Sequence, residues 1–245
     1  MKNKRRSFLK KSAIAGTGFF IVPRNVLGGT GFTSPSDQLN IAAIGAGGKG
    51  NDIITGAEGD DILVGGLGND IITGGNDNDT ITGGAGNDTY IFNTNDVDAG
   101  ETITEASSGG TDTISVITTT DFANMSNASF DEIEVINFGG ASQTATFKGS
   151  QLTAEVLSLT ETVAGTSKLI VDVESGTTAT FTTMTAETGF TSGTDTITIN
   201  GTTGNETITG PNIASTISGG TGNDTIIGGT AADILSGGAG NDTLT

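Results

Sequence analysis

The sequence predicts an all-β fold in which two blocks of short, repeated coils flank a β-rich region abundant in Thr and Gly. Apolar residues make up only 33% of the chain, and glycine accounts for 40 of its 245 residues. A nine-residue pattern also recurs without a gap in two stretches. So little bulky apolar material favours a repetitive fold with a thin core over a conventional globular core.

Charge is distributed very unevenly along the chain. Seven of the ten basic residues lie within residues 1–24, and from residue 25 on 28 acids face 3 bases, a net charge of 3 − 28 = −25. A compact state with this charge repels itself and needs a positive partner. The balance argues against nucleic acid as a ligand and favours divalent cations.

The chain contains no His and no Cys. Catalytic triads with histidine, thiolate nucleophiles, disulfides and zinc sites of the usual His and Cys types are therefore excluded. No arrangement of carboxylates or lysines suggests catalysis, so we expect the chain not to be an enzyme.

The nine-residue units form one block over residues 47–91 and another over residues 201–245, with five units each. Position six carries Asp52, Asp61, Asp70, Asp79 and Asp88 in the first block, and Glu206, Ser215, Asp224, Asp233 and Asp242 in the second. Position eight carries Ile54, Leu63, Ile72, Ile81 and Tyr90, then Ile208, Ile217, Ile226, Leu235 and Leu244. A disordered linker has no need of this strict period or of an apolar eighth position.

Each unit combines a turn, a carboxylate and a short strand. Glycines at positions one, two and four are expected to take positive φ and make a tight turn that exposes backbone carbonyls. The acid at position six adds a carboxylate, and such hard oxygens suit Ca²⁺, which takes six to eight of them. In a strand over positions seven to nine, the side chain at position eight points to the core and its neighbours point away.

The units follow G-G-x-G-x-D-x-U-x, so the chain resembles the RTX (haemolysin-type) calcium-binding family. The resemblance implies a parallel β-roll in which two units make one coil and several Ca²⁺ ions sit between successive loops. It pairs Asp52 with Asp70, Asp70 with Asp88, Asp61 with Asp79, and Asp224 with Asp242. The metal-binding residues it implies are Asp52, Asp61, Asp70, Asp79, Asp88, Asp224, Asp233 and Asp242.

The second block departs from the pattern more than the first. Ser215 offers no carboxylate to Asp233, Glu206 is longer than the consensus acid, and Pro211 interrupts the turn of its unit. Ala231 stands where positive φ is expected, at a cost of about 1 kcal/mol, whereas Asp77 tolerates that conformation better. We expect the first block to bind calcium more tightly.

Residues 1–36 read as an export signal and linker. The basic head with Arg5-Arg6, followed by Phe8-Leu9-Lys10, resembles a twin-arginine signal. The apolar run over 13–22 is too short and rich in glycine for a membrane span. We expect a secreted bacterial protein without a membrane span in the mature chain.

Residues 37–46 read as a strand, and Gly45, Gly47 and Gly50 match the dinucleotide fingerprint G-x-G-x-x-G. With the leader, this stretch resembles the start of an exported oxidoreductase of the Gfo/Idh/MocA family, in which Asp70 would stand where a ribose-binding acid sits. That alternative, an NAD(P)-dependent enzyme, requires a helix after Gly50. The repeats begin there instead, so 37–46 reads as a relic of such a start.

Residues 92–200 lack the repeat but contain four strand-like segments, at 111–116, 132–138, 168–173 and 195–199. They predict an all-β region, either a sandwich or a continued solenoid. Asp131, Glu132 and Glu134 are interpreted as a solvated strand face rather than a catalytic pair.

These observations favour a calcium-dependent extracellular module. Carboxylate repulsion would keep the repeats unfolded where calcium is low, and calcium outside the cell would let them coil. The module would serve a structural or adhesive role with an extracellular or cell-surface partner, or form the accessory part of a secreted hydrolase.

Overall fold

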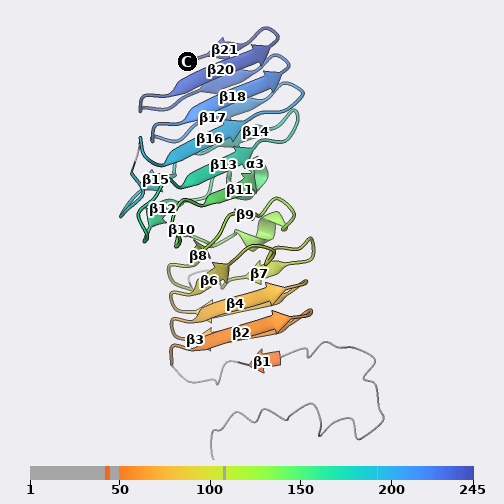
Figure 1. Cartoon of the computed structure of the whole chain (residues 1–245). Coiled ribbons are helices and arrows are strands. Elements are labelled where there is room, and N and C mark those ends of the chain that lie inside the picture. The colour runs from red at the N-terminus through yellow and green to blue at the C-terminus, as the bar shows by residue number, and fades with distance from the viewer. Residues whose placement is uncertain (1–41, 45–49, 107–108, 192) are drawn as a thin grey trace, which may run out of the picture. The chain divides into compact units, whose positions relative to one another are not determined.

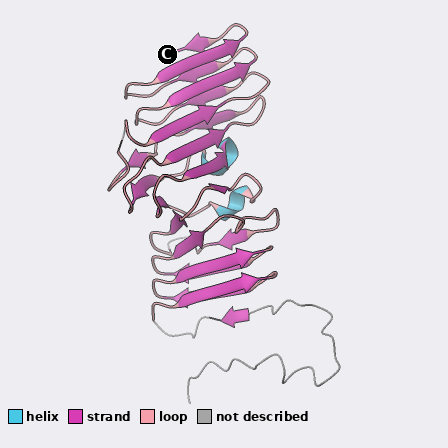
Figure 2. Cartoon of the chain, in the orientation of Figure 1, coloured by secondary structure: helices cyan, strands magenta, loops and turns pink. Residues whose placement is uncertain are grey.

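The computed structural model describes residues 42–44, 50–106, 109–191 and 193–245, and this part of the chain is a parallel β-solenoid (Figure 1). Among the described residues, helix occurs in two short segments, η1 (Asn127–Ser129) and α3 (Gly149–Leu152) (Figure 2). The predicted all-β class with a parallel roll is therefore confirmed. The predicted export signal at 1–36 lies outside the described residues, and of the predicted strand within 37–46 only Ala42–Ile44 is described, as strand β1.

The strands form four parallel sheets. Sheet A contains β1, β3 (Ile62–Leu67), β5 (Thr80–Ala85) and β7 (Thr102–Thr104). Sheet B contains β2 (Ile53–Glu58), β4 (Ile71–Asn76), β6 (Thr89–Phe92), β8 (Thr113–Val116), β10 (Val135–Phe138), β12 (Ser158–Glu161) and β15 (Thr185–Ala186). Sheet C contains β9 (Thr120–Asp121), β11 (Thr144–Lys148), β13 (Lys168–Asp172), β16 (Thr196–Asn200), β18 (Thr216–Thr221) and β20 (Ile234–Ala239). Sheet D contains β14 (Thr178–Thr180), β17 (Thr207–Thr209), β19 (Thr225–Ile227) and β21 (Thr243–Leu244).

Two nine-residue units make one coil, as expected. Ile53 pairs with Ile71 between β2 and β4, and Ile62 pairs with Thr80 between β3 and β5, so each strand stacks on the strand two units later. Successive units consequently alternate between sheets A and B in the first block. The strands are longer than the three residues predicted, because β2, β3, β4 and β5 each run on into the opening glycines of the next unit.

The middle region continues the solenoid, which settles the choice that the sequence left open. The four predicted strands appear as β8, β10, β13 and β16; the first three are slightly shorter than predicted, and β16 is shifted by one residue. Backbone-to-side-chain hydrogen bonds between neighbouring coils here join residues 22 to 30 positions apart, compared with 18 in the repeats. The longer coils have room for a third side, on which η1, α3 and β14 lie between strands of the other sheets.

The core confirms the role predicted for position eight in most units. Eight of these ten side chains are buried, whereas Leu235 is partly buried and Leu244 is 43% exposed. In the middle region the core is aromatic instead. Phe122 stacks on Phe147 with ring centroids 4.6 Å apart, and Phe92 and Phe130 meet Phe122 edge-on.

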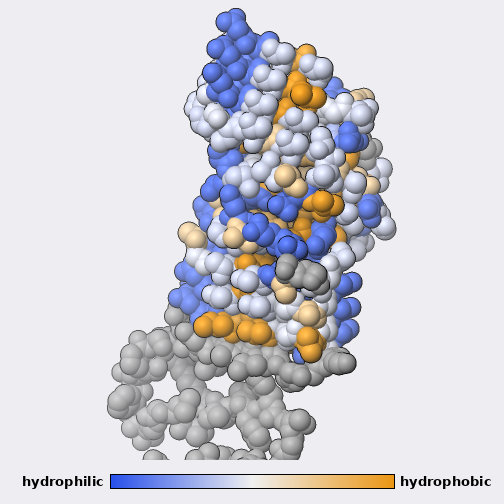
Figure 3. Space-filling model, turned by 180° about the vertical axis from the view of Figure 1, so that it is seen from behind, coloured by the Kyte–Doolittle hydropathy of each residue, from blue (hydrophilic) through white to orange (hydrophobic). Residues whose placement is uncertain are grey.

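The outer surface is largely hydrophilic on the face shown in Figure 3, with apolar residues in short, separate rows. The exposed apolar side chains of the first block belong mainly to position seven, which points away from the core: Ile53, Ile62 and Ile71. Within the described residues, no helix is long and apolar enough to cross a bilayer.

Candidate metal centre

The acid at position six lies at the end of the turn, immediately before a strand begins. Asp52 precedes β2, Asp61 precedes β3 and Asp70 precedes β4. Because strands two units apart pair in register, acids two units apart are stacked on the same side of the roll. The parallel register thus places these carboxylates in columns, one column before each sheet.

A ladder of hydrogen bonds joins the acids within each column. The backbone N–H of Asp52 donates to Oδ1 of Asp70 at 2.7 Å, and the N–H of Asp70 donates to Oδ1 of Asp88 at 2.7 Å. In the other column, the N–H of Asp61 donates to Oδ1 of Asp79 at 2.8 Å. All three pairs expected in the first block are therefore adjacent in space, and one oxygen of each acceptor carboxylate is fixed in direction.

The second carboxylate oxygen, Oδ2, has a different environment from Oδ1. Oδ2 of Asp70, Asp79, Asp88 and Asp224 is buried without a hydrogen-bond partner among the described residues. A buried, unpaired carboxylate oxygen is costly unless a cation or a donor reaches it. These oxygens therefore mark places where a positive ligand would stabilise the fold.

Backbone carbonyls converge on the same places. A Cβ added to Gly65 would lie 2.5 Å from Oδ2 of Asp70 and 2.6 Å from the carbonyl oxygen of Gly83 in the next coil. The glycine at position one is thus required for space and not for positive φ, which corrects the sequence-based expectation. Positive φ occurs at positions two and four, for example at Gly66 and Gly68.

Two conformational expectations have different outcomes. Asp77 does adopt positive φ, at 76°, as its place in the turn predicts. Ala231 does not, so the strain predicted for it was wrong. The turn of that unit takes another path, since an L-residue with a Cβ avoids the left-handed region when the loop permits it.

The second block keeps the ladder with substitutions. The N–H of Asp224 donates to Oδ1 of Asp242 at 3.0 Å, as predicted, and the N–H of Glu206 donates to Asp224 at 2.8 Å. Both the N–H and the hydroxyl of Ser215 donate to Oδ1 of Asp233, at 2.9 and 3.0 Å. The position of Ser215 therefore contributes donors where the other units contribute a carboxylate.

The ladder extends beyond the repeats into residues that sequence reasoning missed. Asp79 donates its N–H to Glu101 at 3.1 Å, Asp88 donates to Asp112 at 2.8 Å, and Asp112 donates to Glu134 at 2.7 Å. Glu134 was interpreted as part of a solvated strand face, whereas it continues a column of acids. A local signal exists: Glu101 and Asp112 each precede Thr-Ile, as Asp79 does in the repeats.

Position five forms a second ladder that was also missed. Oδ1 of Asn51 accepts the N–H of Asn69 at 3.1 Å, and Oδ1 of Asn69 accepts the N–H of Asn87 at 2.9 Å. The same bonds join Asn205, Asn223 and Asn241 at 2.8 Å each. These amides satisfy donors of the following coil, whereas the acids satisfy donors of the preceding one.

Burial of so many acids perturbs their proton affinities. Burial, together with the charges of Asp79, Asp96 and Asp98, raises the pKa of Glu101 to about 8. Burial and then the charge of Asp112 likewise raise the pKa of Glu105 to about 8. Burial is also the main cause that raises the pKa values of Asp79 and Asp112 to about 6. In each case burial is the main cause of the raised pKa, and the charges of neighbouring carboxylates add to it.

The donor set fits calcium. The convergent groups are carboxylate and carbonyl oxygens, the hard ligands that Ca²⁺ takes in flexible geometry. In this arrangement Asp70, Asp79, Asp88 and Asp224 would each offer the unpaired Oδ2, while Oδ1 stays bonded to the neighbouring coil. A bound Ca²⁺ would supply the positive charge that these columns lack.

The oxidoreductase alternative is not supported. Gly45 and Gly47 of the fingerprint lie outside the described residues, and Gly50 leads through Asn51 and Asp52 directly into strand β2. No helix follows to bind a pyrophosphate at its N-terminus. Asp70, the suggested ribose-binding acid, bonds to the Asp52 N–H inside the roll.

Comparison with known proteins gives a match for the repeats. A family model described as the RTX calcium-binding nonapeptide repeat (4 copies) matches over residues 44–72, 55–90 and 214–244. No curated protein and no solved structure matches the chain. The stacked acids, the glycine turns and this match lead to one conclusion: residues 44–90 and 214–244 carry RTX calcium-binding nonapeptide repeats, and these repeats support calcium binding by the chain.

Proposed function

We propose that the chain is a secreted protein whose repeat blocks fold when they bind several Ca²⁺ ions, and that it acts as a structural or adhesive module, or as the accessory part of an extracellular protein. The proposed calcium ligands are the carboxylates of Asp52, Asp61, Asp70, Asp79, Asp88, Asp224, Asp233 and Asp242.

The unpaired Oδ2 atoms of Asp70, Asp79 and Asp88 carry this proposal. They are held in the interior of a segment whose net charge is −25 over residues 25–245. Without a cation, the coils bring these charges together in a medium that stabilises them poorly. With a cation, the same oxygens become ligands, so the free energy of binding becomes free energy of folding.

The coupling of folding to calcium binding is consistent with export. Where free calcium is low, repulsion between stacked acids favours the unfolded chain, and where calcium is abundant the coils close. The basic head and apolar run within residues 1–36 support export, and a roll that closes after export suits a module that works outside the cell.

The proposal is tested by following folding and binding together on the full chain. Circular dichroism during a Ca²⁺ titration should show a gain of β signal, and calorimetry should give a stoichiometry of several ions. An Asp70→Asn, Asp224→Asn double variant should bind fewer ions, because one carboxylate is lost in each block. Identical spectra in EDTA and in Ca²⁺, with no heat of binding, would overturn the proposal.

A further inference from the structure

The end of the first block differs from the coils before it. The register of β5 and β7 pairs Thr82 with Thr104, so Glu105 stands opposite Gly83, where every preceding coil has a glycine. Two side chains therefore enter the space that the consensus leaves to backbone. One is the side chain of Glu105, which brings a carboxylate. The other is the side chain of Tyr90, which stands at position eight in place of an aliphatic residue and brings a hydroxyl.

Three oxygens from different residues meet beside Gly83. A Cβ added there would lie 2.6 Å from Oδ2 of Asp88 and would also strike Oε1 of Glu105 and the hydroxyl of Tyr90. At Gly65, one coil earlier, the corresponding neighbours are one carboxylate and the carbonyl of Gly83. The junction thus replaces a backbone carbonyl with a second carboxylate and a phenol.

None of these three oxygens has a hydrogen-bond partner within the described part of the chain. Tyr90 is 0% exposed and Asp88 is 1% exposed, so water does not reach them from the surface. A buried tyrosine hydroxyl normally finds a partner, and a buried carboxylate oxygen needs one more strongly. Three such oxygen atoms around one point are suited to a positively charged ligand.

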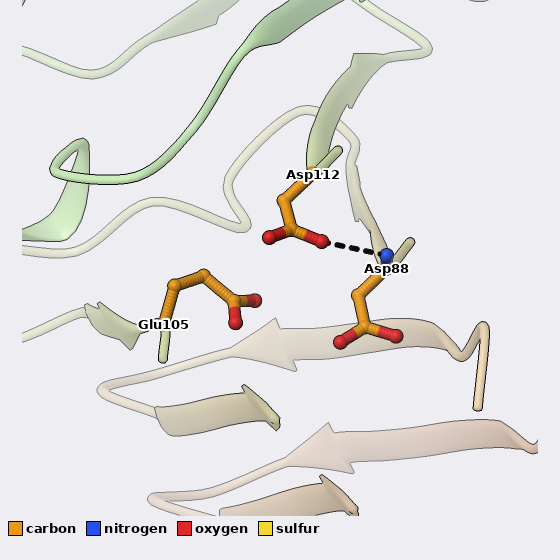
Figure 4. Close-up of side chains that lie close together, drawn as sticks. All are labelled: Asp88, Glu105 and Asp112. Atoms are coloured by element: carbon orange, nitrogen blue, oxygen red, sulfur yellow. Dashed lines mark hydrogen bonds between the residues drawn. The ribbon is translucent and has the colours of Figure 1, made fainter. Parts of the chain in front are cut away.

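A third acid completes the cluster. One carboxylate oxygen from each of Asp88, Glu105 and Asp112 lies within 4.8 Å of the others, and the three side chains face a common space (Figure 4). The second carboxylate oxygens of Asp112 and Glu105 are held by backbone N–H groups. Oδ1 of Asp112 accepts the N–H of Asp88 at 2.8 Å, and Oε2 of Glu105 accepts the N–H groups of Gly84 and Ala106, each at 3.3 Å.

We propose that Asp88, Glu105, Asp112 and the Tyr90 hydroxyl form a side-chain site for a hard cation of the Ca²⁺ class, distinct in composition from the repeat sites. It rests on the proposed function, because Asp88 also belongs to the calcium-binding repeats. Three carboxylates give it more negative charge than a site built largely from carbonyls, so it should favour ions of high charge density. The site joins the last coil of the first block to the first long coil of the middle region.

The composition of the chain provides a selective probe. Tyr90 is the only tyrosine, and tryptophan is absent. Terbium(III), a hard cation with oxygen ligands, emits when a nearby aromatic ring transfers energy to it, and this transfer falls steeply with distance. Tyrosine-sensitised emission from the full chain should therefore report chiefly on this junction, and Ca²⁺ should compete with it.

The test compares Glu105→Gln with Glu58→Gln, an exposed glutamate of the first block that loses the same charge. Glu105→Gln should lower the terbium affinity read from sensitised emission by about tenfold or more, the scale for one disturbed metal ligand. It should also reduce the calorimetric Ca²⁺ stoichiometry by one, while Glu58→Gln changes neither. Tyr90→Phe keeps the ring in the core and should weaken calcium binding in the same calorimetric step.

The outcomes separate this inference from the proposed function. Glu105→Gln and Tyr90→Phe variants that bind calcium with the parent's stoichiometry and affinities would overturn the junction site and leave the repeat sites standing. A parent chain that binds no calcium at all would overturn both. If Glu105→Gln does not fold, Tyr90→Phe decides, since it removes one oxygen and no charge.

Discussion

The repeat blocks and the middle region are parts of one solenoid, but they are stabilised differently. In the repeats most units bury one apolar side chain, such as Leu63 or Ile72, and the coils have two sides. In the middle region the coils have three sides around packed phenylalanines, including Phe122 and Phe147. The middle region buries more apolar surface in each coil and so gains more from the hydrophobic effect.

Asp195 of the middle region and Asp70 of the repeats show two ways to accommodate a buried acid. In the middle region both oxygens of Asp195 accept hydrogen bonds, from the N–H of Ser167 at 2.8 Å and the N–H of Thr191 at 2.6 Å. In the repeats, Asp70 has one oxygen bonded and the other buried without a partner in the described structure. The comparison teaches that a coil can satisfy a buried acid with its own donors or leave it to a cation.

The largest expected effect is that calcium removal separates the two regions. In EDTA, the repeats over 50–91 and 216–244 should lose amide protection, while β10, β11 and β13 keep it, because their core and hydrogen bonds need no cation. Hydrogen exchange followed by mass spectrometry, with and without Ca²⁺, measures this difference. Equal loss of protection in both regions would show that the middle region depends on calcium as much as the repeats do.

Truncation of a core side chain in the middle region should make that region less stable than the calcium-loaded repeats. Phe122→Ala removes the ring that contacts Phe92, Phe130 and Phe147, and it should cost about 3–5 kcal/mol in the free energy of unfolding. Denaturant titration in saturating Ca²⁺ provides the measurement. Ile53→Ala, at a side chain that is 80% exposed, is the matched control and should change stability little.

Matched substitutions of two acids should distinguish their roles. Asp70→Asn should lower calcium affinity by about tenfold or more, because it removes a charged ligand. Asp195→Asn should leave calcium binding unchanged and destabilise the fold by about 1–3 kcal/mol, because the N–H groups of Ser167 and Thr191 lose a charged acceptor. Calorimetry and thermal unfolding of both variants separate the two effects. A loss of calcium affinity in Asp195→Asn would contradict the distinction.

Acid should partly replace calcium where the first block meets the middle region. Burial raises the pKa values of Glu101 and Glu105 to about 8 and those of Asp79 and Asp112 to about 6 in the calcium-free fold. The folded form therefore binds more protons than the unfolded chain between the ordinary carboxyl range and about pH 8. Its stability should rise as pH falls through this window and be lost as pH rises. Thermal unfolding in EDTA across the window should show it, and a midpoint that falls on acidification would contradict it.

The sequence predicted the repeat blocks well because their chemistry is local. The spacing of the glycines, the acid at position six and the apolar residue at position eight each constrain one unit, and the parallel register then follows from repetition. For the middle region the sequence left two folds open, a sandwich and a continued solenoid, because its coils vary in length and show no fixed period. Glu101 and Asp112 are displaced by 22 and 24 residues from their partners Asp79 and Asp88, so the period of 18 does not reach them.

The incorrect predictions have a common physical cause. A sequence pattern does not show which residues of neighbouring coils come into contact. Gly65 reads as a turn residue, whereas the structure needs it to make room for Asp70 and Gly83. Glu134 reads as a solvated acid, whereas the N–H of Asp112 lies against it. Both roles depend on contacts between coils, which only the three-dimensional register supplies.

The opposite directions of the aspartate and asparagine ladders bear on how such a chain grows. Each coil of the first block offers similar hydrogen-bond donors and acceptors to the coil before it and to the coil after it. An inserted pair of units could therefore form the same hydrogen bonds with both neighbouring coils. An inserted single unit would instead exchange the two sheets for everything that follows it. Lengthening by gene duplication should therefore proceed in steps of eighteen residues, and a deletion of nine should be far more harmful than a deletion twice its size.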